Sequence, residues 1–363
     1  MDCLSEIDDP RRSSNGTLHD FREILVMAIA AALSDSDTVE DIAHWARMRE
    51  AWLRRFLVLK NGVPSEDTFL RIFRLLDPKQ FEASFRRWVS GVVTALGGTL
   101  AIDGKTVRGS GSGGEDALHM VSAFATDLGL VLGQEKVSGK SNEIMAIPQL
   151  LAALHLKGLL VSIDAMGCQK LIADQIVAQG GDYLLTVKGN QTSLLQAIQE
   201  AFLDRKAQAS RHEWVEKSHG RLVCQMASVL PAAGIVDPAA WMKCQVIGRI
   251  DSVRQAGSKT AALEQRYYIA SRALTPEELA RAVRSHWGIE NRLHWVLDVT
   301  MGEDGSTVRK DHAPQNLSLL KKIVLNLIRQ DTTDAVKCSL RIKRKRAAWD
   351  DDVRMAMLGL KPL

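Results

Sequence analysis

The spacing of hydrophobic residues changes along the chain and divides it into regions. Up to residue 97, apolar side chains recur every three or four positions, most clearly around the Ala-rich segment Phe21–Leu33. That period is typical of α-helices that share a core, so we predict a helical N-terminal domain over residues 1–97. Its last helix follows Pro64 and carries Arg71 and Arg74. Helix-turn-helix DNA binding and plain bundle packing both explain this helix.

From residue 98 the pattern becomes one of short apolar strands. We expect three strands and then helices and strands in alternation: strands Thr99–Asp103, His119–Thr126 and Leu130–Val137, helix Glu143–His155, strand Leu159–Ile163, helix Gln169–Gln179, strand Tyr183–Val187 and helix Leu194–Arg205. This order is that of an α/β catalytic core of ribonuclease H-like type, a mixed sheet flanked by helices. Its first part covers residues 98–211.

Residues 212–272 interrupt this order. Apolar and polar positions alternate there between polar connections, which predicts a β-rich insertion. Helical spacing returns after Thr275, which precedes a Pro and two Glu in the pattern of a helix start. We assign residues 273–330 to the core, as a long helix and the helix after it. Residues 331–363 are expected to form a basic C-terminal tail.

Composition narrows the class of protein. The chain has 363 residues, 46% hydrophobic and 25% charged, which is ordinary for a globular protein of two or three domains. Its five Cys include no CxxC pair, and the apolar run Ile24–Leu33 is too short to span a bilayer. Acidic rather than basic residues precede that run, unlike in a signal peptide. We therefore expect a cytoplasmic protein without a zinc site, a disulfide framework or membrane association.

Positive charge gathers near the C-terminus, although the net charge is only +4. Residues 305–346 contain eleven Lys and Arg against three Asp. The densest run holds five basic residues in six positions: Arg341, Lys343, Arg344, Lys345 and Arg346. Binding to DNA phosphates and a loose, solvated tail explain this run equally well.

Two aspartates each end an apolar strand. Asp103 follows residues 100–102, and Asp164 follows residues 159–163. A carboxylate at the end of a buried strand is costly unless it binds a metal or a partner. A single such Asp more often caps a turn or a helix. In the predicted order, however, the first and fourth strands are neighbours, so both carboxylates can approach the same cations.

A third ligand is expected from the helix that begins at Pro276. One stripe of this helix, in steps of three or four, consists of Leu279, Val283, Trp287, Glu290, His294 and Leu297. Glu290 interrupts a largely apolar face, where a free carboxylate is costly. The alternative to metal binding is pairing of Glu290 with an arginine of the same helix: Arg281, Arg284 or Arg292. Three other acidic residues nearby are further candidate ligands: Asp298, Glu303 and Asp304.

Three carboxylates placed in this way suit phosphodiester chemistry. Two Mg²⁺ ions about 4 Å apart activate an oxygen nucleophile and stabilise the leaving 3′ oxygen, and hard oxygen ligands hold them. The nucleophile is water in hydrolysis and a DNA 3′-hydroxyl in strand transfer. Lys105, Arg108 and Lys188 follow the strands that carry this chemistry. They either hold neighbouring phosphates or are ordinary surface charges.

Six short motifs in a fixed order carry a family resemblance: Ala101–Gly109, Lys140–Glu143, Ser162–Gln169, Asp182–Gln191, His219–Arg221 and His286–Asp298. Through them the chain, from about Leu25 to Arg329, resembles the ISAs-type (H-repeat-associated) transposases of bacterial insertion sequences, which belong to the DDE class. The resemblance implies that Asp103, Asp164 and Glu290 are the catalytic DDE triad and its metal ligands. It also implies that the N-terminal domain assists DNA binding.

The resemblance further implies a two-metal-ion DNA transposase that uses Mg²⁺, with Mn²⁺ as a possible substitute. Such an enzyme binds the inverted repeats of its element in double-stranded DNA, cleaves the ends and joins them to target DNA. A homodimer on DNA in the bacterial cytoplasm, associated with the nucleoid, is expected. A ribonuclease H-like nuclease without strand transfer and an inactive or domesticated DNA-binding copy are the alternatives.

The remaining motif residues permit two interpretations each. Lys188 and Asn190 follow a strand and either contact DNA or support the catalytic loop. His219 and Arg221 lie in the insertion, where DNA contact is one interpretation. Trp287 and Trp295 either stack on an unpaired base or pack in the core.

Overall fold

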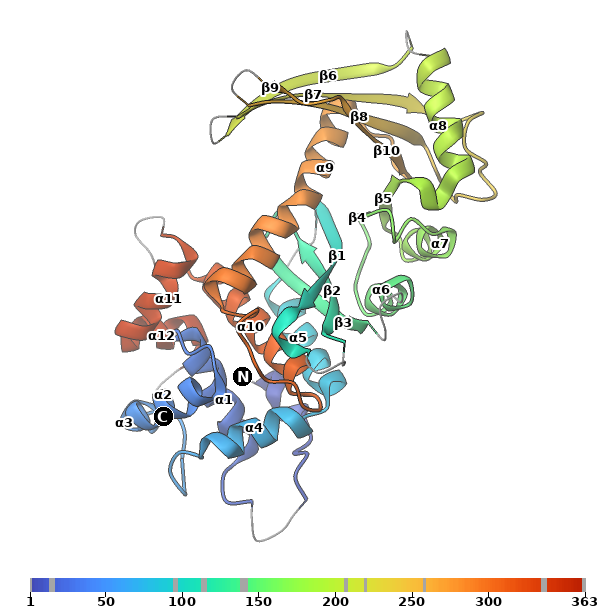
Figure 1. Cartoon of the computed structure of the whole chain (residues 1–363). Helices are drawn as coiled ribbons and strands as arrows, with labels where there is room; N and C mark the ends of the chain where they lie inside the picture. Colours follow the sequence, from blue (N-terminus) through green and yellow to red (C-terminus); the bar gives the residue numbers. More distant parts are fainter. Residues whose placement is uncertain are drawn as a thin grey trace.

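The computed structural model describes residues 2–12, 17–93, 97–111, 116–137, 143–205, 208–218, 221–256, 259–333 and 338–360 (Figure 1). Its helices are α1 (Phe21–Leu33), α2 (Val39–Met48), α3 (Glu50–Leu53), α4 (Glu66–Leu75), α5 (Pro78–Val92), α6 (Glu143–Ala152), α7 (Lys170–Ala178), α8 (Thr192–Asp204), α9 (Pro276–Ile289), α10 (Ala313–Gln330), α11 (Leu340–Trp349) and α12 (Asp351–Leu358). Its strands are β1 (Thr99–Val107), β2 (Leu118–Ala125), β3 (Leu130–Val137), β4 (Leu160–Ile163), β5 (Asp182–Val187), β6 (Ser210–Ser218), β7 (Arg221–Pro231), β8 (Val246–Ala256), β9 (Lys259–Thr260) and β10 (Glu264–Ala270).

Helices α1 to α5 form the helical N-terminal region that the sequence predicts. Every apolar side chain of α1 is buried, because α2, α10, α11 and α12 pack around this helix. The side chain of Asp20 caps its first turn by accepting hydrogen bonds from the backbone N–H groups of Arg22 and Glu23. Helix α4 packs against α2 and α10, and its Arg74 pairs with Asp311 at 2.7 Å. Bundle packing therefore accounts for this helix.

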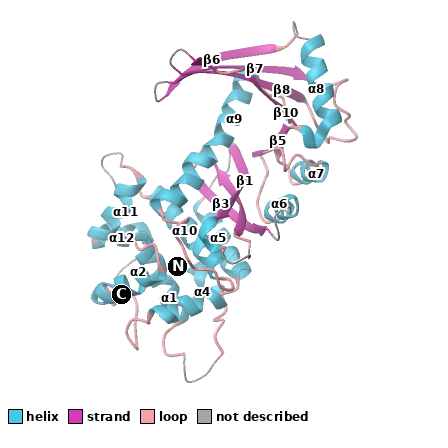
Figure 2. Ribbon diagram, viewed as in Figure 1, coloured by secondary structure: helices cyan, strands magenta, loops and turns pink. Residues whose placement is uncertain are grey.

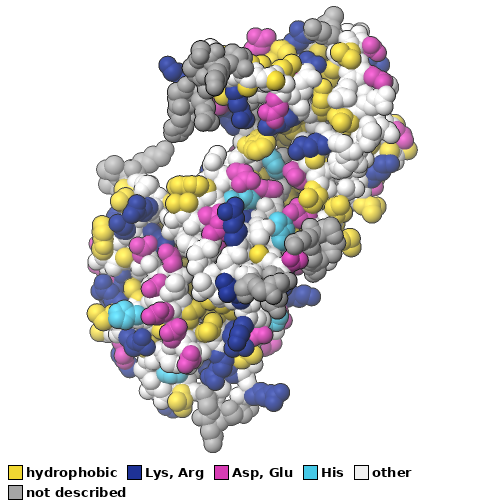
Figure 3. Space-filling model, in the orientation of Figure 1, with side chains coloured by type: hydrophobic (Ala, Val, Ile, Leu, Met, Phe, Trp, Pro, Cys, Tyr) yellow, Lys and Arg dark blue, Asp and Glu magenta, His cyan; other side chains and the backbone are white. Residues whose placement is uncertain are grey.

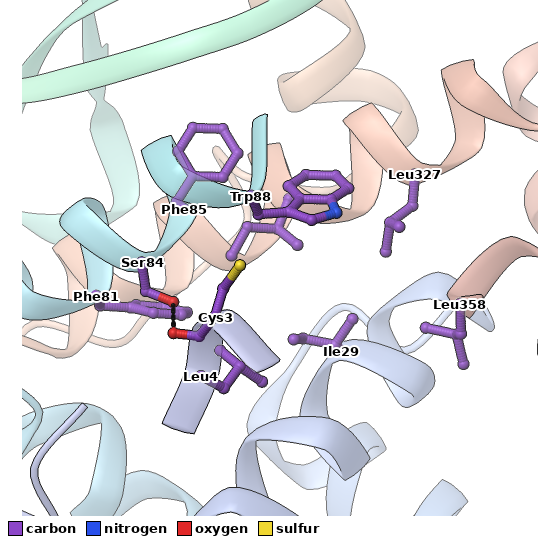
Figure 4. Close-up of a pocket in the computed structure, with 10 residues that line it drawn as sticks. Cys3, Leu4, Ile29, Phe81, Ser84, Phe85, Trp88, Leu327 and Leu358 are labelled. Carbon is purple, nitrogen blue, oxygen red and sulfur yellow. Dashed lines mark hydrogen bonds between the residues drawn. The ribbon is translucent and has the colours of Figure 1, made fainter. Parts of the chain in front are cut away.

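A small apolar pocket lies where the N-terminal segment meets this bundle (Figure 4). Its volume is about 70 Å³, and its lining joins residues from four helices and the chain start: Cys3, Leu4, Ile29, Phe81, Ser84, Phe85, Trp88, Ile323, Leu327 and Leu358. The Ser84 hydroxyl donates a hydrogen bond to the carbonyl of Cys3 at 2.6 Å. This contact fastens the first turn of the chain to α5. None of the described helices is long and apolar enough to cross a membrane.

The central sheet has the topology expected of a ribonuclease H-like core. In the described chain its strands follow the order β3-β2-β1-β4-β5-β10-β8-β7-β6, and β9 pairs with β8. Strands β3, β2 and β1 are antiparallel neighbours, while β1, β4 and β5 run parallel. The prediction that the first and fourth strands are neighbours is confirmed.

The β-rich segment predicted as an insertion continues this same sheet. Strand β10 pairs antiparallel with β5, and β8, β7 and β6 extend the sheet from there. Helix α9 packs against β1 and β4 of the core and against β6, β7 and β8. Figure 2 shows α9 running from the extended end of the sheet toward the helical region. The helix thereby brings the residues that follow it back to β1.

Within the segment predicted as a basic C-terminal tail, residues 331–363, the described chain forms two helices, α11 and α12. Helices α11 and α12 pack against α1 and α10. Arg344 of α11 is only 1% exposed, and its guanidinium donates to the carbonyl of Ala32 at 3.0 and 3.1 Å. It also pairs with Asp37 at 2.5 Å and with Asp35 at 3.1 Å. Because this side chain is buried between carboxylates, Arg344 is no longer a candidate DNA contact.

Candidate active site

Asp103 and Asp164 follow neighbouring positions of two paired strands. Ile102 of β1 pairs in register with Ile163 of β4, and an aspartate comes next on each strand. Asp103 stays within β1, and its side chain is 20% exposed. Asp164 begins the loop after β4, where its Oδ1 accepts a hydrogen bond from the backbone N–H of Met166 at 3.0 Å. The parallel pairing therefore places both carboxylates at the same part of the sheet.

Glu290 approaches Asp103 from the continuation of α9. The α-helix ends at Ile289, and two π-helical turns follow, Glu290–His294 and Val296–Thr300. Such turns are frequent at functional sites. Nδ1 of His294 lies 3.3 Å from Oε2 of Glu290 and 3.7 Å from Oδ2 of Asp103. Ligand atoms of these three side chains all lie within 4.8 Å of one another.

Pairing of Glu290 with an arginine is not seen among the described residues. The three arginines considered have other partners: Arg281 pairs with Glu277, Arg284 pairs with Glu216, and Arg292 donates to the carbonyl of Thr126. The side chain of Glu290 is 55% exposed, so it is not the buried partner of an arginine that the alternative requires. Glu290 is thus open to a ligand from solvent.

Crowded carboxylates perturb the ionisation of this site. Burial raises the pKa of Asp103 to about 7, and the charges of Glu290, Asp164 and Glu143 add to the effect. Burial also lowers the pKa of His294, against the attraction of Glu290. Burial likewise lowers the pKa of His286, although Asp164, a hydrogen bond to the backbone of Ser162, and Glu290 act to raise it. The charge of Asp164 thus acts on both Asp103 and His286.

The donor set of this site fits a divalent metal ion. Asp103 and Glu290 supply the hard oxygen ligands that Mg²⁺ and Mn²⁺ prefer. A cation beside Asp103 stabilises its ionised form against both burial and the neighbouring carboxylates, the two causes that raise its pKa. Nε2 of His294 is buried without a hydrogen-bond partner among the described residues, as is Nδ1 of His286. The imidazoles therefore retain atoms able to contact a ligand.

A fourth carboxylate, Glu143, lies beside Asp103 and was not assigned a role from the sequence. It is the first residue of α6, and its Oε1 hydrogen-bonds Nε2 of His119 on β2. Nδ1 of His119 in turn contacts the hydroxyl of Thr106 at 2.8 Å. A Cβ at Gly104 would lie only 2.4 Å from Oε1 of Glu143, so a side chain at this position would displace the pair. No periodic pattern marks Glu143, because only the fold brings α6 to β1.

Lys105 and Arg108, both expected as phosphate contacts, have different surroundings. The Lys105 side chain is 9% exposed and lies in a cluster of carboxylates formed by Asp298, Glu303 and Asp304. Burial opposes ionisation of Lys105, but these carboxylates outweigh it and raise the pKa of the ammonium group. The Arg108 side chain is 83% exposed and only 3.8 Å from Asp304. Arg108 therefore remains a candidate DNA contact, whereas Lys105 is an internal counter-ion.

The turn after β5 supports the loop after Asp164. The side-chain amide of Asn190 donates to the carbonyl of Ala165 at 2.6 Å, and that of Gln191 donates to the carbonyl of Cys168 at 2.8 Å. Of the two interpretations of Asn190, DNA contact and support of the catalytic loop, this hydrogen bond matches the second. Lys188, just before this turn, is exposed and stays a candidate DNA contact.

The remaining candidate DNA contacts lie on α11 and in the β-rich segment. Arg341 is exposed on α11, whereas Lys343 pairs with Asp331 at 3.2 Å. Lys345 lies over the ring of Trp349, and Arg346 is half-buried on the same helix. His219 and the side chain of Arg221 lie outside the described residues, as do residues 140–142 of the second motif.

Two tryptophans flank Glu290 on the exposed side of this helix. Trp287 is 48% exposed and Trp295 is 56% exposed, so neither is a core residue. The guanidinium of Arg266 lies 4.6 Å from the centre of the Trp287 ring. In Figure 3, acidic and histidine side chains gather in the middle of the visible face, over the region where Figure 1 shows α9 beside β1. The exposed aromatic surface thus lies next to the acidic site.

Comparison with known proteins shows which sequences this chain is similar to. Residues 95–327 match the model of the transposase DDE domain, and residues 1–89 match the model of the domain associated with it. "Putative transposase YncI" of Escherichia coli O157:H7 is 39% identical over 96% of this chain and 91% of its own length. "H repeat-associated putative transposase YhhI" of Escherichia coli K12 is 36% identical over 99% of this chain and 97% of its own.

A solved structure is also similar. The synaptic complex of piggyBac transposase with hairpin DNA superposes with a TM-score of 0.46 and 11% identity, covering all of this chain and 80% of the piggyBac chain. That similarity is below the level at which two chains are assigned one fold.

Proposed function

Because the chain belongs to the family of transposases with a DDE domain, we propose that it binds the inverted repeats of an insertion sequence, cleaves the DNA at its ends and joins them to target DNA. The observation that carries this proposal is the convergence of ligand atoms of Asp103, Glu290 and His294 within 4.8 Å, beside strand β4, which Asp164 follows. Phosphodiester transfer by metal-ion catalysis uses a carboxylate cluster of this kind to hold the cations.

Asp103, Asp164 and Glu290 are the proposed ligands of two divalent cations, Mg²⁺ or Mn²⁺. When bound, such cations supply a Lewis acid that activates the attacking oxygen and stabilises the leaving oxygen. His294 orients the Glu290 carboxylate through its contact at 3.3 Å. Asn190 and Gln191 hold the loop that carries Asp164.

DNA contact is proposed for basic side chains around this site. Arg108 and Lys188 are exposed near the carboxylates, and Arg341 is exposed on α11. Lys345, Arg346, His219 and Arg221 are retained as proposed contacts from the sequence. Trp287 and Trp295 offer exposed ring faces on which an unpaired base can stack. Two copies of the chain are proposed to act on paired DNA ends.

A joining assay tests this function. A labelled duplex ending at the element terminus is incubated with supercoiled target DNA and Mg²⁺, using the wild type and Asp164→Asn. We expect joined product with the wild type only, and equal binding of the duplex by both proteins, since Asp164 is a metal ligand and not a phosphate contact. Cleavage without joining would instead identify a nuclease. Binding without either reaction would identify an inactive DNA-binding copy.

A further inference from the structure

Lys105 connects the strand that carries Asp103 to the segment that follows Glu290. Its Nζ lies 2.6 Å from Oδ1 of Asp298, 2.8 Å from Oε2 of Glu303 and 3.7 Å from Oδ1 of Asp304. Glu303 is 2% exposed and Lys105 is nearly as buried, so these contacts are shielded from water. Ion pairs in such surroundings depend on exact geometry.

The position of Lys105 in β1 relates it directly to Asp103. Side chains two residues apart on a strand point to the same face, so Lys105 and Asp103 both face the continuation of α9. Asp298 lies in the second π-helical turn, and Glu290 begins the first. One face of β1 therefore meets one helical segment at two places, at Glu290 and at Asp298.

The partners of Lys105 are themselves fixed to α10. Oε1 of Glu303 accepts a hydrogen bond from the hydroxyl of Ser318 at 2.8 Å, and the backbone N–H of Glu303 donates to the carbonyl of Leu297 at 2.9 Å. Ser318 also accepts a hydrogen bond from the ammonium group of Lys322 at 3.0 Å. The cluster is therefore a rigid attachment between β1, the π-helical segment and α10.

We propose that Lys105 is a positioning residue, whose ammonium group sets the separation of the Asp103 and Glu290 carboxylates and thereby the affinity of the site for a divalent cation. This inference rests on the proposed function, because it takes these carboxylates as metal ligands. Lys105 does not touch the reacting groups, and its burial prevents it from contacting DNA phosphates.

If Lys105 is replaced by an uncharged residue, a purely electrostatic role and a positioning role predict opposite changes in the affinity of the site for a cation. Removing a positive charge near the site strengthens cation binding through space. Releasing the helical segment from β1 separates the ligands and weakens cation binding, by about tenfold or more for a residue that orients metal ligands. The direction of the change therefore distinguishes the two effects.

The experiment measures Mn²⁺ affinity of the full chain by calorimetry, together with its thermal unfolding. We compare the wild type, Lys105→Met and Lys322→Met. Lys322 is a more deeply buried lysine of the same network, and its hydrogen bonds go to Gln134 and Ser318 and not to Asp298. We expect both variants to lose stability and only Lys105→Met to lose about tenfold or more in Mn²⁺ affinity. Lys105→Arg, which keeps the charge but changes its geometry, should also weaken Mn²⁺ binding.

Three results would overturn the inference. Equal Mn²⁺ affinity of the wild type and both Lys105 variants would show that Lys105 has a purely structural role. Tighter Mn²⁺ binding by Lys105→Met would show that Lys105 acts on the site only through repulsion by its charge. A wild type that binds no Mn²⁺ would remove the site itself. A wild type whose Mn²⁺ affinity depends on Lys105 but which does not join DNA would contradict the proposed function and leave the positioning role intact.

Discussion

The side-chain amide of Asn190 donates a hydrogen bond of 2.6 Å to the carbonyl of Ala165, the residue after Asp164. The turn after β5 thereby holds the loop after β4, and Gln191 adds a second contact to the same loop. Lys188, two positions earlier, is exposed and makes neither contact. Neighbouring residues of one motif thus have separate roles, one in supporting the site and one facing solvent.

Asn190→Ala should lower the rate of DNA cleavage about tenfold, because a lost hydrogen bond of about 1.4 kcal/mol frees the loop that carries Asp164. DNA affinity should stay unchanged. Lys188→Ala is the matched variant and should weaken DNA affinity and lower its salt slope by about one. Single-turnover cleavage and binding titrations at several salt concentrations measure both effects. Weaker DNA affinity of Asn190→Ala with an unchanged rate of DNA cleavage would show that Asn190 contacts DNA and does not support the loop.

Glu143→Gln should weaken the affinity for Mn²⁺ several-fold, because it removes a negative charge that acts on Asp103. His119→Gln should have a smaller effect, since it disturbs the partner of Glu143 but keeps the carboxylate. Glu213→Gln, on the distant strand β6, is the control for loss of one charge. Calorimetric titration with Mn²⁺ compares the three variants. The same affinity in Glu143→Gln and Glu213→Gln would place Glu143 outside the metal site.

Arg344→Leu should lower the free energy of unfolding by about 3–5 kcal/mol, because it leaves two carboxylates and a backbone carbonyl without their buried partner. Arg341→Leu, three positions earlier on the exposed side of α11, should keep the stability and weaken DNA binding. Urea unfolding and DNA titration of both variants provide the measurements. Full stability of Arg344→Leu would contradict its structural role.

Glu82 should make stability depend on pH. Burial raises the pKa of this carboxyl to about 7 in the folded chain, from a usual value of 4.5. Between these values the unfolded chain loses its proton first, so the free energy of unfolding falls as pH rises from 4.5 to 7 and stays low above. The shift corresponds to a loss of up to about 3 kcal/mol.

Glu82→Gln removes this titration and should therefore gain stability relative to the wild type as pH rises from 4.5 to 8. Urea unfolding across this range measures the difference between the two proteins. Glu200→Gln, at an exposed position of α8, is the control for an added amide. A constant difference in stability between Glu82→Gln and the wild type at all pH values would show that Glu82 ionises normally.

The sequence predicted those features that depend on local pattern. The α/β order and the helix start at Thr275 follow from periodicity and capping, and the neighbouring strands of Asp103 and Asp164 follow from the ribonuclease H-like order of the elements. The burial of Arg344 could not be predicted, because its partners Asp35 and Asp37 lie some three hundred residues away in the chain.

Long-range contacts also decide which charged residues belong to the site. Lys105 has the pattern of a surface cation until the chain folds Asp298 and Glu303 onto it. Glu143 ends one of the six motifs, but only the fold shows that its carboxylate lies beside β1. Asp298 and Glu303 were candidates for the third ligand, and their pairing with Lys105 favours Glu290 instead. Spacing along the helix does not show which acidic residue is the ligand, because the answer depends on Lys105, a counter-ion from strand β1.

Nicking of a labelled element-end duplex in Mg²⁺ tests the central claim most directly. The wild type is compared with Glu290→Gln and with Glu277→Gln, which changes an exposed glutamate of the same helix. The account predicts metal-dependent nicking by the wild type and Glu277→Gln, and its loss in Glu290→Gln with DNA binding intact. Nicking that persists in Glu290→Gln would contradict the assignment of Glu290 as the third ligand.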